Sequence, residues 1–283
     1  MNPLALWFAD GRILFVGLGL HVLGQSLLFR ARRPRIQIPA RILVILGMTL
    51  VLLSATPVPR WAILLWIGTA LACFWPHNSH ARKRKAEIRL SGAIVLLLLL
   101  ELPWHRPPPI FLPPNATLHV LGDSLSAGTG MGEHLWTDTF ARRLQLTLHN
   151  HAQPGATLSD GLRQAESLPA DPATVLIFLG GNDLLGTATA RQFETDLATL
   201  LDTLQAQGHT LLLQELPLLP FRADFGRAQR RQAASRQIRL LPKRLITRAL
   251  APPGATLDGL HLSDTGHRLL AESLASHFRT SEN

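Results

Sequence analysis

The first hundred residues contain four long apolar runs. These are Ile13–Phe29, Ile42–Thr56, Ala62–Trp75 and Leu90–Leu102. Each run has roughly 13 to 17 residues, close to the ~17 that a membrane-spanning helix needs. A run such as residues 93–100 has no polar face, which argues against the helical bundle of a soluble protein. The pattern therefore predicts an all-α transmembrane region of about four helices.

From Thr117 onward, short apolar strands alternate with amphipathic helices. The predicted strands are Thr117–Leu121, Thr174–Leu179 and His209–Glu215, and the predicted helices are His134–Leu148, Thr189–Gln207 and Asp264–His277. Such alternation is typical of an α/β domain with a parallel sheet that helices cover on both faces. We therefore expect a transmembrane region at 1–105, a stiff, extended Pro-rich linker at 106–115 and an α/β domain at 116–283.

Charge is distributed unevenly between these parts. The 283 residues carry a net charge of +9, but residues 1–110 hold 13 Lys and Arg against 3 acids, whereas residues 111–283 hold 15 against 16. The basic excess belongs to the membrane part, so the lipid bilayer is an expected partner and nucleic acid is not. One cysteine, Cys73, excludes a disulfide scaffold and a Cys-rich metal site.

Basic residues concentrate in two loops, Arg30–Arg41 and His77–Arg89. They are Arg30, Arg32, Arg33, Arg35, Arg41, Arg82, Lys83, Arg84, Lys85 and Arg89. The positive-inside rule makes both loops cytoplasmic, so the chain after Trp104 lies outside. Asp10 offsets Arg12 before the first run, which is not typical of a cleaved signal peptide. We expect a multi-pass protein of a bacterial inner membrane with a periplasmic α/β domain.

Polar side chains inside the apolar runs admit two interpretations. His21 and Gln25 lie four residues apart on one predicted helix face, and Glu101 lies near the end of the fourth run. Intramembrane polar groups are candidates for function. Hydrogen bonding between packed helices is the simpler explanation.

Four short blocks of the α/β domain lie in loops that we expect at the carboxyl ends of the strands, where such folds carry their functional residues. They are Gly122-Asp123-Ser124-Leu125, Pro154-Gly155, Gly180-Gly181-Asn182-Asp183 and Asp258-Gly259-Leu260-His261. A serine nucleophile needs a base, and the base needs an acceptor that fixes its tautomer. Ser124, His261 and Asp258 supply these groups. The backbone N–H groups of Ser124 and Gly155 and the side-chain amide of Asn182 could hold an oxyanion.

These blocks, in this order, resemble the SGNH hydrolases, also called the GDSL lipase/esterase family, from about Thr117 to Phe278. The resemblance implies a flavodoxin-like three-layer αβα fold, a Ser124–His261–Asp258 triad, an oxyanion hole of Ser124, Gly155 and Asn182, and no metal or organic cofactor. The stretch around Ser124 looks most like the thioesterase I/lysophospholipase L1/arylesterase branch. Ala156 departs from that branch, which often has Asp at this position.

Histidine pairs and a basic segment complete the set of candidate features. The pairs His77/His80 and His149/His151 lack the further ligands of a metal site and are interpreted as surface histidines. Residues 225–257 contain no acid but eight basic residues, namely Arg227, Arg230, Arg231, Arg236, Arg239, Lys243, Arg244 and Arg248. They form either a face for anionic lipid headgroups or a helix surface balanced by acids elsewhere in the domain.

The sequence thus predicts a membrane-anchored serine esterase that hydrolyses acyl or acetyl esters of lipids, lysophospholipids or O-acetylated envelope glycans. Two alternatives remain open. The same acyl-enzyme could serve an O-acyltransferase or a deacetylase acting on a surface polysaccharide. A non-catalytic envelope scaffold, with protein partners bound through the membrane region, could also keep the fold.

Overall fold

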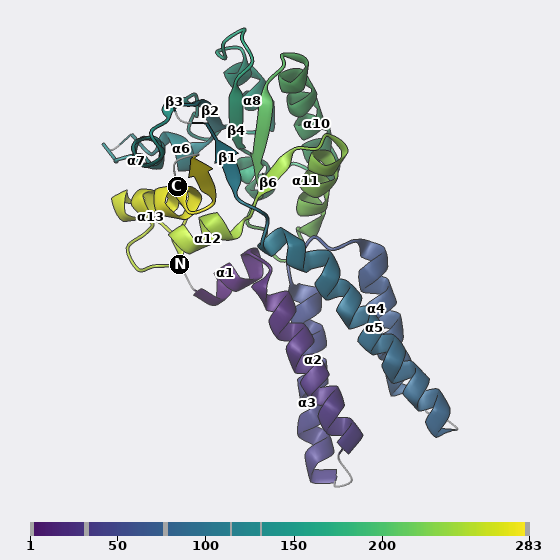
Figure 1. Cartoon of the computed structure of the whole chain (residues 1–283). Coiled ribbons are helices and arrows are strands. Elements are labelled where there is room, and N and C mark those ends of the chain that lie inside the picture. Colours follow the sequence, from purple (N-terminus) through teal and green to yellow (C-terminus); the bar gives the residue numbers. More distant parts are fainter. Residues whose placement is uncertain (1–2, 31–33, 76–78, 114, 131, 281–283) are drawn as a thin grey trace. The chain divides into compact units, whose positions relative to one another are not determined.

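The structure is a computed structural model that describes residues 3–30, 34–75, 79–113, 115–130 and 132–280. Of the residues singled out above, Arg32, Arg33, His77 and Pro114 lie outside these ranges. The chain divides into two compact units (Figure 1). A helical unit comprises Trp7–Arg106 and Leu219–Ala223, and an α/β unit comprises Met1–Leu6, Pro107–Leu218 and Asp224–Asn283.

The N-terminal part of the chain is helical. Its helices are α1 (Pro3–Ala9), α2 (Arg12–Arg30), α3 (Pro34–Leu53), α4 (Arg60–Phe74) and α5 (His80–His105). Two segments of the described chain, Arg12–Arg30 and Arg35–Leu53, are long and apolar enough to cross a membrane, whereas the apolar α4 has only 15 residues. The predicted count of about four spanning helices is therefore not confirmed.

Both of the basic loops predicted from the sequence are in large part helical. Helix α3 begins at Pro34, and α5 begins at His80, ten residues before the fourth apolar run. The side chain of Ser79 caps α5 by accepting a hydrogen bond from Arg82 N at 3.3 Å. Lys, Arg, Ala and Glu all favour helices, so a charged segment of this composition continues the helix instead of ending it.

Helices α2 and α3 pack through glycines. A Cβ added at Gly17 would lie 2.8 Å from Gly47 O, and one added at Gly47 would lie 2.6 Å from Gly17 O. Only glycine permits such a close approach of the two backbones. Helices α2, α3, α4 and α5 share an apolar cluster that includes Leu14, Val51, Trp66 and Leu97.

One polar residue of these helices, His21, does not follow the simpler expectation. His21 is fully buried, and within the described residues neither of its ring nitrogens has a hydrogen-bond partner. Its ring meets the Trp66 ring edge-on, with centroids 5.5 Å apart. Glu101 bonds to His105 Nε2 at 3.2 Å on its own helix. Hydrogen bonding between helices therefore does not explain His21.

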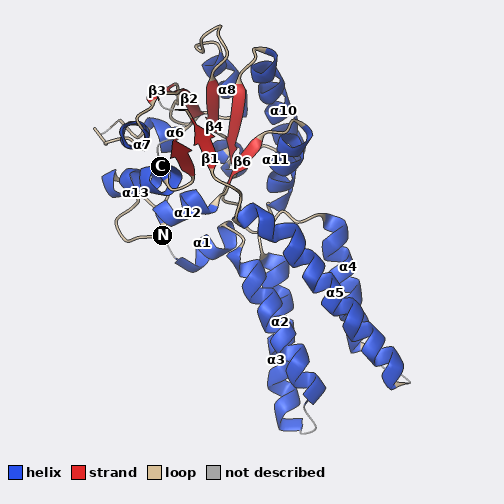
Figure 2. Ribbon diagram, in the orientation of Figure 1, coloured by secondary structure: helices blue, strands red, loops and turns tan. Residues whose placement is uncertain are grey.

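The α/β unit is built on a five-stranded sheet in the order β3-β2-β4-β5-β6, with all neighbours parallel (Figure 2). The strands are β2 (Thr117–Gly122), β3 (Thr147–Asn150), β4 (Thr174–Phe178), β5 (Thr210–Gln214) and β6 (Arg239–Leu241). This order is that of flavodoxin-like folds, in which the chain leaves the first strand to one side and later returns to the other. The predicted α/β class is confirmed.

Helices cover both faces of this sheet, and each lies between strands or near the C-terminus. They are α6 (Ser124–Ala127), α7 (Trp136–Leu144), α8 (Leu158–Ala165), α9 (Gly181–Leu185), α10 (Ala190–Ala206), α11 (Ala223–Ser235), α12 (Arg244–Leu250) and α13 (Asp264–Ala275). The core on one face joins Leu118, Leu176, Phe140 and Leu270. Residues such as Val175, Leu197 and Leu200, which are fully buried, belong to the opposite face.

Two predicted segments differ in the structure. The helix expected over His134–Leu148 ends at Leu144, because Gln145 turns the chain in the left-handed region with φ 54°, and β3 follows. In the predicted linker, β1 (Ile110–Leu112) pairs in parallel with β7 (Phe278–Thr280). The side chains of Ile110 and Leu112 are buried in the core. Residues 110–112 of the predicted linker are therefore part of the α/β unit.

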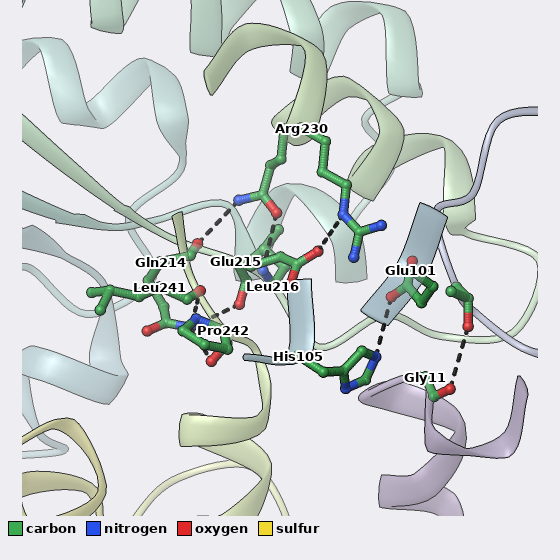
Figure 3. A network of polar contacts seen from close by, with 11 residues as sticks. Gly11, Glu101, His105, Gln214, Glu215, Leu216, Arg230, Leu241 and Pro242 are labelled. Atoms are coloured by element: carbon green, nitrogen blue, oxygen red, sulfur yellow. Dashed lines mark hydrogen bonds and ion pairs between the residues drawn. The ribbon is translucent and has the colours of Figure 1, made fainter. Parts of the chain in front are cut away.

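Acids balance much of the basic segment at residues 225–257. Arg227 pairs with Asp224, Arg231 pairs with Glu194 at 2.6 Å, and Arg236 pairs with Asp202 at 2.7 Å. The pair of Arg230 with Glu215, at 2.9 Å, is buried beside the Gln214 side chain, which donates to Leu241 O and Pro242 O at 3.3 Å (Figure 3). The structure thus favours the balanced helix surface for these four arginines.

Candidate active site

Ser124 follows β2, the strand at which the order of strands in the sheet reverses: β3 is added on one side of β2, and β4 on the other. It is the first residue of α6 and lies two residues after the end of β2. The strand next to β2 in the sheet, β4, leads to the Asn182 block. In open parallel sheets, ligands bind at such a topological switch point, at the carboxyl ends of the strands. Ser124 and the Asn182 block therefore lie at the edge of the sheet where open α/β folds bind their ligands.

Several buried contacts hold the Ser124 turn. The Gln164 side chain accepts from Gly122 N and donates to Gly122 O, both at 2.9 Å. Asn150 Nδ2 donates to Ser126 O at 2.8 Å. Gly122 is required here because a Cβ would lie 2.9 Å from Ser126 Oγ. The turn is thus fixed on both sides by side-chain amides.

Asp258 and His261 form a hydrogen-bonded pair in the loop before α13. Asp258 Oδ2 lies 2.6 Å from His261 Nδ1, while Oδ1 accepts from the backbone N–H groups of Leu260 at 2.9 Å and His261 at 2.8 Å. The hydrogen bond to the His261 side chain, followed by those to the backbone, holds the pKa of Asp258 well below its usual range. Because Nδ1 donates to the carboxylate, Nε2 is left as the basic nitrogen.

Asp123 links this loop to the Ser124 turn. Its side chain is buried and caps α6 by accepting from Leu125 N at 3.0 Å. Burial raises its pKa to about 6, while the charge of His261 lowers it and that of Asp183 raises it. A Cβ added at Gly181 would lie 3.1 Å from Asp123 Oδ2. The loops after β2 and β4 and the His261 loop therefore converge around Asp123.

The Gly155 turn is joined to the Asn182 block. Asn182 Nδ2 donates one proton to Ala156 O at 2.9 Å, and Asp183 Oδ2 accepts from Leu158 N at 3.0 Å. Gly155 has φ 76°, a left-handed conformation that favours glycine. Within the described residues, the N–H groups of Ser124 and Gly155 donate to no protein acceptor. These two groups and the second Nδ2 proton of Asn182 remain available to a ligand.

Four of the five site residues predicted from the sequence fall into two sets of contacts, and Ser124 belongs to neither set. The structure joins Asp258 to His261, and it joins Asn182 to the Gly155 turn. Among the described residues, no hydrogen bond connects the Ser124 hydroxyl to the His261 ring. In unliganded active sites such bonds are often long and tighten only when substrate is bound.

Sequence reasoning missed Gln164 and Asp183, which position the site without belonging to its chemistry. Gln164 is a buried polar residue on α8, a helix that was not predicted. Nothing in the sequence around it therefore indicated its role. Asp183 belongs to the third block, where an Asn-Asp pair is also typical of an ordinary turn. Its position next to Asn182, a candidate oxyanion donor, could have indicated that the Asp183 carboxylate helps to position the site.

Histidines gather at the β2–β3 edge without forming a metal site among the described residues. The ring of His119 stacks on those of His149 and His151, with centroids 4.9 Å and 5.2 Å away. His119 Nδ1 lies 3.0 Å from His151 Nε2. Burial, and then the charges of the neighbouring histidines, lower the pKa of His119 to about 4, so the His119 ring is neutral at pH 7.

Comparisons with known proteins identify the family of the α/β unit. The model of the GDSL-like Lipase/Acylhydrolase family matches residues 120–269. Esterase TesA of Pseudomonas aeruginosa is 30% identical over 166 residues, which cover 54% of this chain and 78% of TesA.

Two solved structures are similar to the α/β unit. The crystal structure of TesA matches with a TM-score of 0.50 and 29% identity, covering 57% of this chain and 97% of that one. The psychrotrophic esterase EstA from Pseudoalteromonas, inhibited by monoethylphosphonate, has the same fold, with a TM-score of 0.50, 23% identity and coverage of 57% and 95%. The chain belongs to the GDSL-like lipase/acylhydrolase family, the SGNH hydrolases, and is an esterase-type acylhydrolase of that family.

Proposed function

We propose that the protein is a membrane-anchored serine esterase that uses Ser124, His261 and Asp258. The single observation that carries this proposal is the Asp258–His261 hydrogen bond of 2.6 Å, in a loop whose imidazole acts electrostatically on Asp123, the residue before Ser124. This arrangement supports an imidazole that is oriented by a carboxylate and held near a serine.

The reaction follows from these positions. Ser124 Oγ attacks the ester carbonyl carbon while His261 Nε2 takes its proton, and Asp258 stabilises the resulting imidazolium. The negative charge on the carbonyl oxygen is held by the N–H groups of Ser124 and Gly155 and by Asn182 Nδ2. The C–O bond then breaks, and His261 returns the proton to the leaving alcohol. Water attacks the acyl-enzyme by the same route and releases the acid.

Substitution of the nucleophile tests this mechanism. Ser124→Ala should remove nearly all hydrolysis of p-nitrophenyl esters, and Asn182→Ala should lower turnover by about 10²–10³, because an oxyanion donor is lost. Ser126→Ala, two residues along the same helix, is the matched control and should retain activity. A Ser124→Ala variant that hydrolyses esters at the wild-type rate would contradict the mechanism.

Exposed leucines near the site support an apolar acyl group in the substrate. Leu185 follows the Asn182 block, and Leu257 and Leu260 flank Asp258; they are 50%, 50% and 42% exposed. Apolar side chains beside a polar reaction centre favour esters with a hydrocarbon chain, such as those of lipids. We expect kcat/KM to rise from acetyl to longer p-nitrophenyl esters. A maximum at acetyl would favour the deacetylase alternative, and diversion of product to an added acceptor alcohol would favour acyl transfer.

Apolar surfaces on the helical unit support the anchoring. Large hydrophobic side chains on α2 to α5 are exposed, among them Leu23, Ile45, Leu64 and Leu99, and so is Trp75 directly after α4. An apolar surface of this kind marks contact with a membrane or another protein. Arg30, Arg35, Arg41 and the basic first half of α5 favour a cytoplasmic location for the ends that carry them, with the α/β unit in the periplasm.

A further inference from the structure

The helical unit contains a groove that the esterase chemistry does not use. Its volume is about 320 Å³, and it lies between the second half of α2 and residues 87–94 of α5. Val22 and Phe29 of α2 and Leu90 and Ile94 of α5 form its apolar part. Phe29 is 70% exposed and Val22 is 45% exposed, so this apolar surface is open to what surrounds the helices.

Polar residues make up the rest of the lining, and two of them carry opposite charges. Arg30 is the last residue of α2, and Glu87 lies on α5. Within the described part of the chain, no ion pair joins these two side chains. Gln25 and Ser91 also line the groove, and the Ser91 hydroxyl donates to Glu87 O at 3.0 Å. The groove thus offers one cation, one anion and hydrogen-bonding groups beside an apolar wall.

We propose that this groove binds an aminophospholipid from the bilayer. The proposal rests on the proposed anchoring of the helical unit in a membrane. The lipid phosphate meets the guanidinium of Arg30, the primary ammonium meets the carboxylate of Glu87, and an acyl chain lies along Phe29, Leu90 and Ile94. Charge-assisted hydrogen bonds of this kind are about twice as strong as neutral ones, and more so where the surroundings are apolar.

The two charges distinguish this lipid from the others of a membrane. A lipid with an anionic headgroup and no cation would leave the Glu87 carboxylate facing a negative charge. A choline headgroup carries a cation, but its quaternary nitrogen has no proton to donate to Glu87. The basic residues near the groove, Lys83, Arg84 and Arg89, attract anionic lipids by charge alone. Selection between headgroups therefore falls to Glu87.

Native mass spectrometry of the full-length protein in detergent tests the proposal, with phosphatidylethanolamine, phosphatidylglycerol or phosphatidylcholine added singly. Wild-type protein should retain one phosphatidylethanolamine at least tenfold more tightly than either other lipid. Glu87→Gln should abolish this preference, and Arg30→Gln should weaken phosphatidylethanolamine and phosphatidylglycerol together. Ser91→Trp should block the groove. Ile88→Trp and Arg41→Gln, which lie outside the groove, should bind as the wild type does.

The outcomes separate this proposal from the anchoring. Wild-type protein that leaves the membrane pellet in a carbonate wash would contradict the anchoring, and the groove proposal with it. Anchored protein that shows equal retention of the three lipids would overturn the groove proposal alone. Glu87→Gln or Ser91→Trp variants that bind phosphatidylethanolamine as the wild type does would also overturn it. A thermal unfolding midpoint close to that of the wild type identifies the variants that are folded.

Discussion

At the scale of single residues, the site depends on a carboxylate that is costly to bury. Asp123 caps the helix that begins with Ser124, and burial raises its pKa to about 6 from the usual 3.8. Between pH 6 and 4 the folded state therefore binds a proton more readily than the unfolded state does. By linkage, the unfolding free energy falls as pH rises through this window.

Substitution of Asp123 by Asn tests this effect. Asparagine can still accept from Leu125 N but does not ionise, so the loss of stability between pH 4 and 6 should shrink. The unfolding free energy at pH 7 should rise by at most about 3 kcal/mol, the equivalent of two pKa units. The thermal unfolding midpoint of the full-length protein, measured from pH 4 to 8, checks this. Asp138→Asn, at an exposed position on α7, should leave the pH dependence unchanged, and an unchanged profile for Asp123→Asn would contradict the account.

Gln164 should be equally important for holding the turn. Gln164→Leu removes both hydrogen bonds to the buried Gly122 backbone, which should cost about 2–4 kcal/mol of unfolding free energy. Turnover should fall with little change in KM, because Ser124 is displaced while the acyl pocket stays intact. Urea unfolding and ester kinetics measure the two effects. Gln192→Leu on the exposed face of α10 serves as the control, and equal behaviour of the two variants would count against the role of Gln164.

The sequence could indicate the residues of the site but not their supports. Ser124, Asn182, Asp258 and His261 lie in short blocks that have few other uses in combination. Gln164 acts through a contact 42 residues away in the chain, and nothing in its local sequence marks it. The relation of the Gly155 turn to Asn182 likewise depends on how two loops meet in space.

At the scale of elements, the close packing of α2 against α3 requires glycine at the contact between the two helices. A side chain at Gly47 would overlap Gly17 O and His21 N, both 2.6 Å from the added Cβ. Gly47→Leu should therefore separate the helices and lower the thermal unfolding midpoint in detergent by several degrees. Gly19→Leu, on α2 where an added Cβ meets nothing within 4 Å, should be tolerated. A tolerated Gly47→Leu would mean that the helices do not pack in this way.

Elements were predictable where their pattern is local. Residues 189–207 have a clear helical period, and α10 differs from the prediction by only one residue at each end. Strand β3 was not predicted because Leu144, Leu146 and Leu148 continue the apolar pattern of the helix past the end of α7. Strands β1 and β7 have only three residues each, and their pairing joins the two ends of the α/β unit. Strands this short are stabilised mainly by pairing and packing with their neighbour, so their own sequence does not predict them.

At the scale of the whole molecule, the uneven charge predicts an orientation in the membrane. If the basic ends of α2, α3 and α5 are cytoplasmic, a cysteine placed at Ser79 should be protected from a membrane-impermeant maleimide in intact spheroplasts. A cysteine at the exposed Ser276 of α13 should be labelled. Both variants are made after Cys73→Ser, which removes the one natural thiol. Labelling at both positions, or the reverse pattern, would contradict the proposed orientation.

The central claim is that His261, held by Asp258, activates Ser124 for acyl transfer. Its most direct test is the mapping by mass spectrometry of the adduct formed with a fluorophosphonate probe. We predict a single modified residue, Ser124, in the wild-type protein, and labelling at least 10²-fold slower in His261→Ala. Absence of the adduct from Ser124, or a labelling rate in His261→Ala equal to that of the wild type, would contradict the claim.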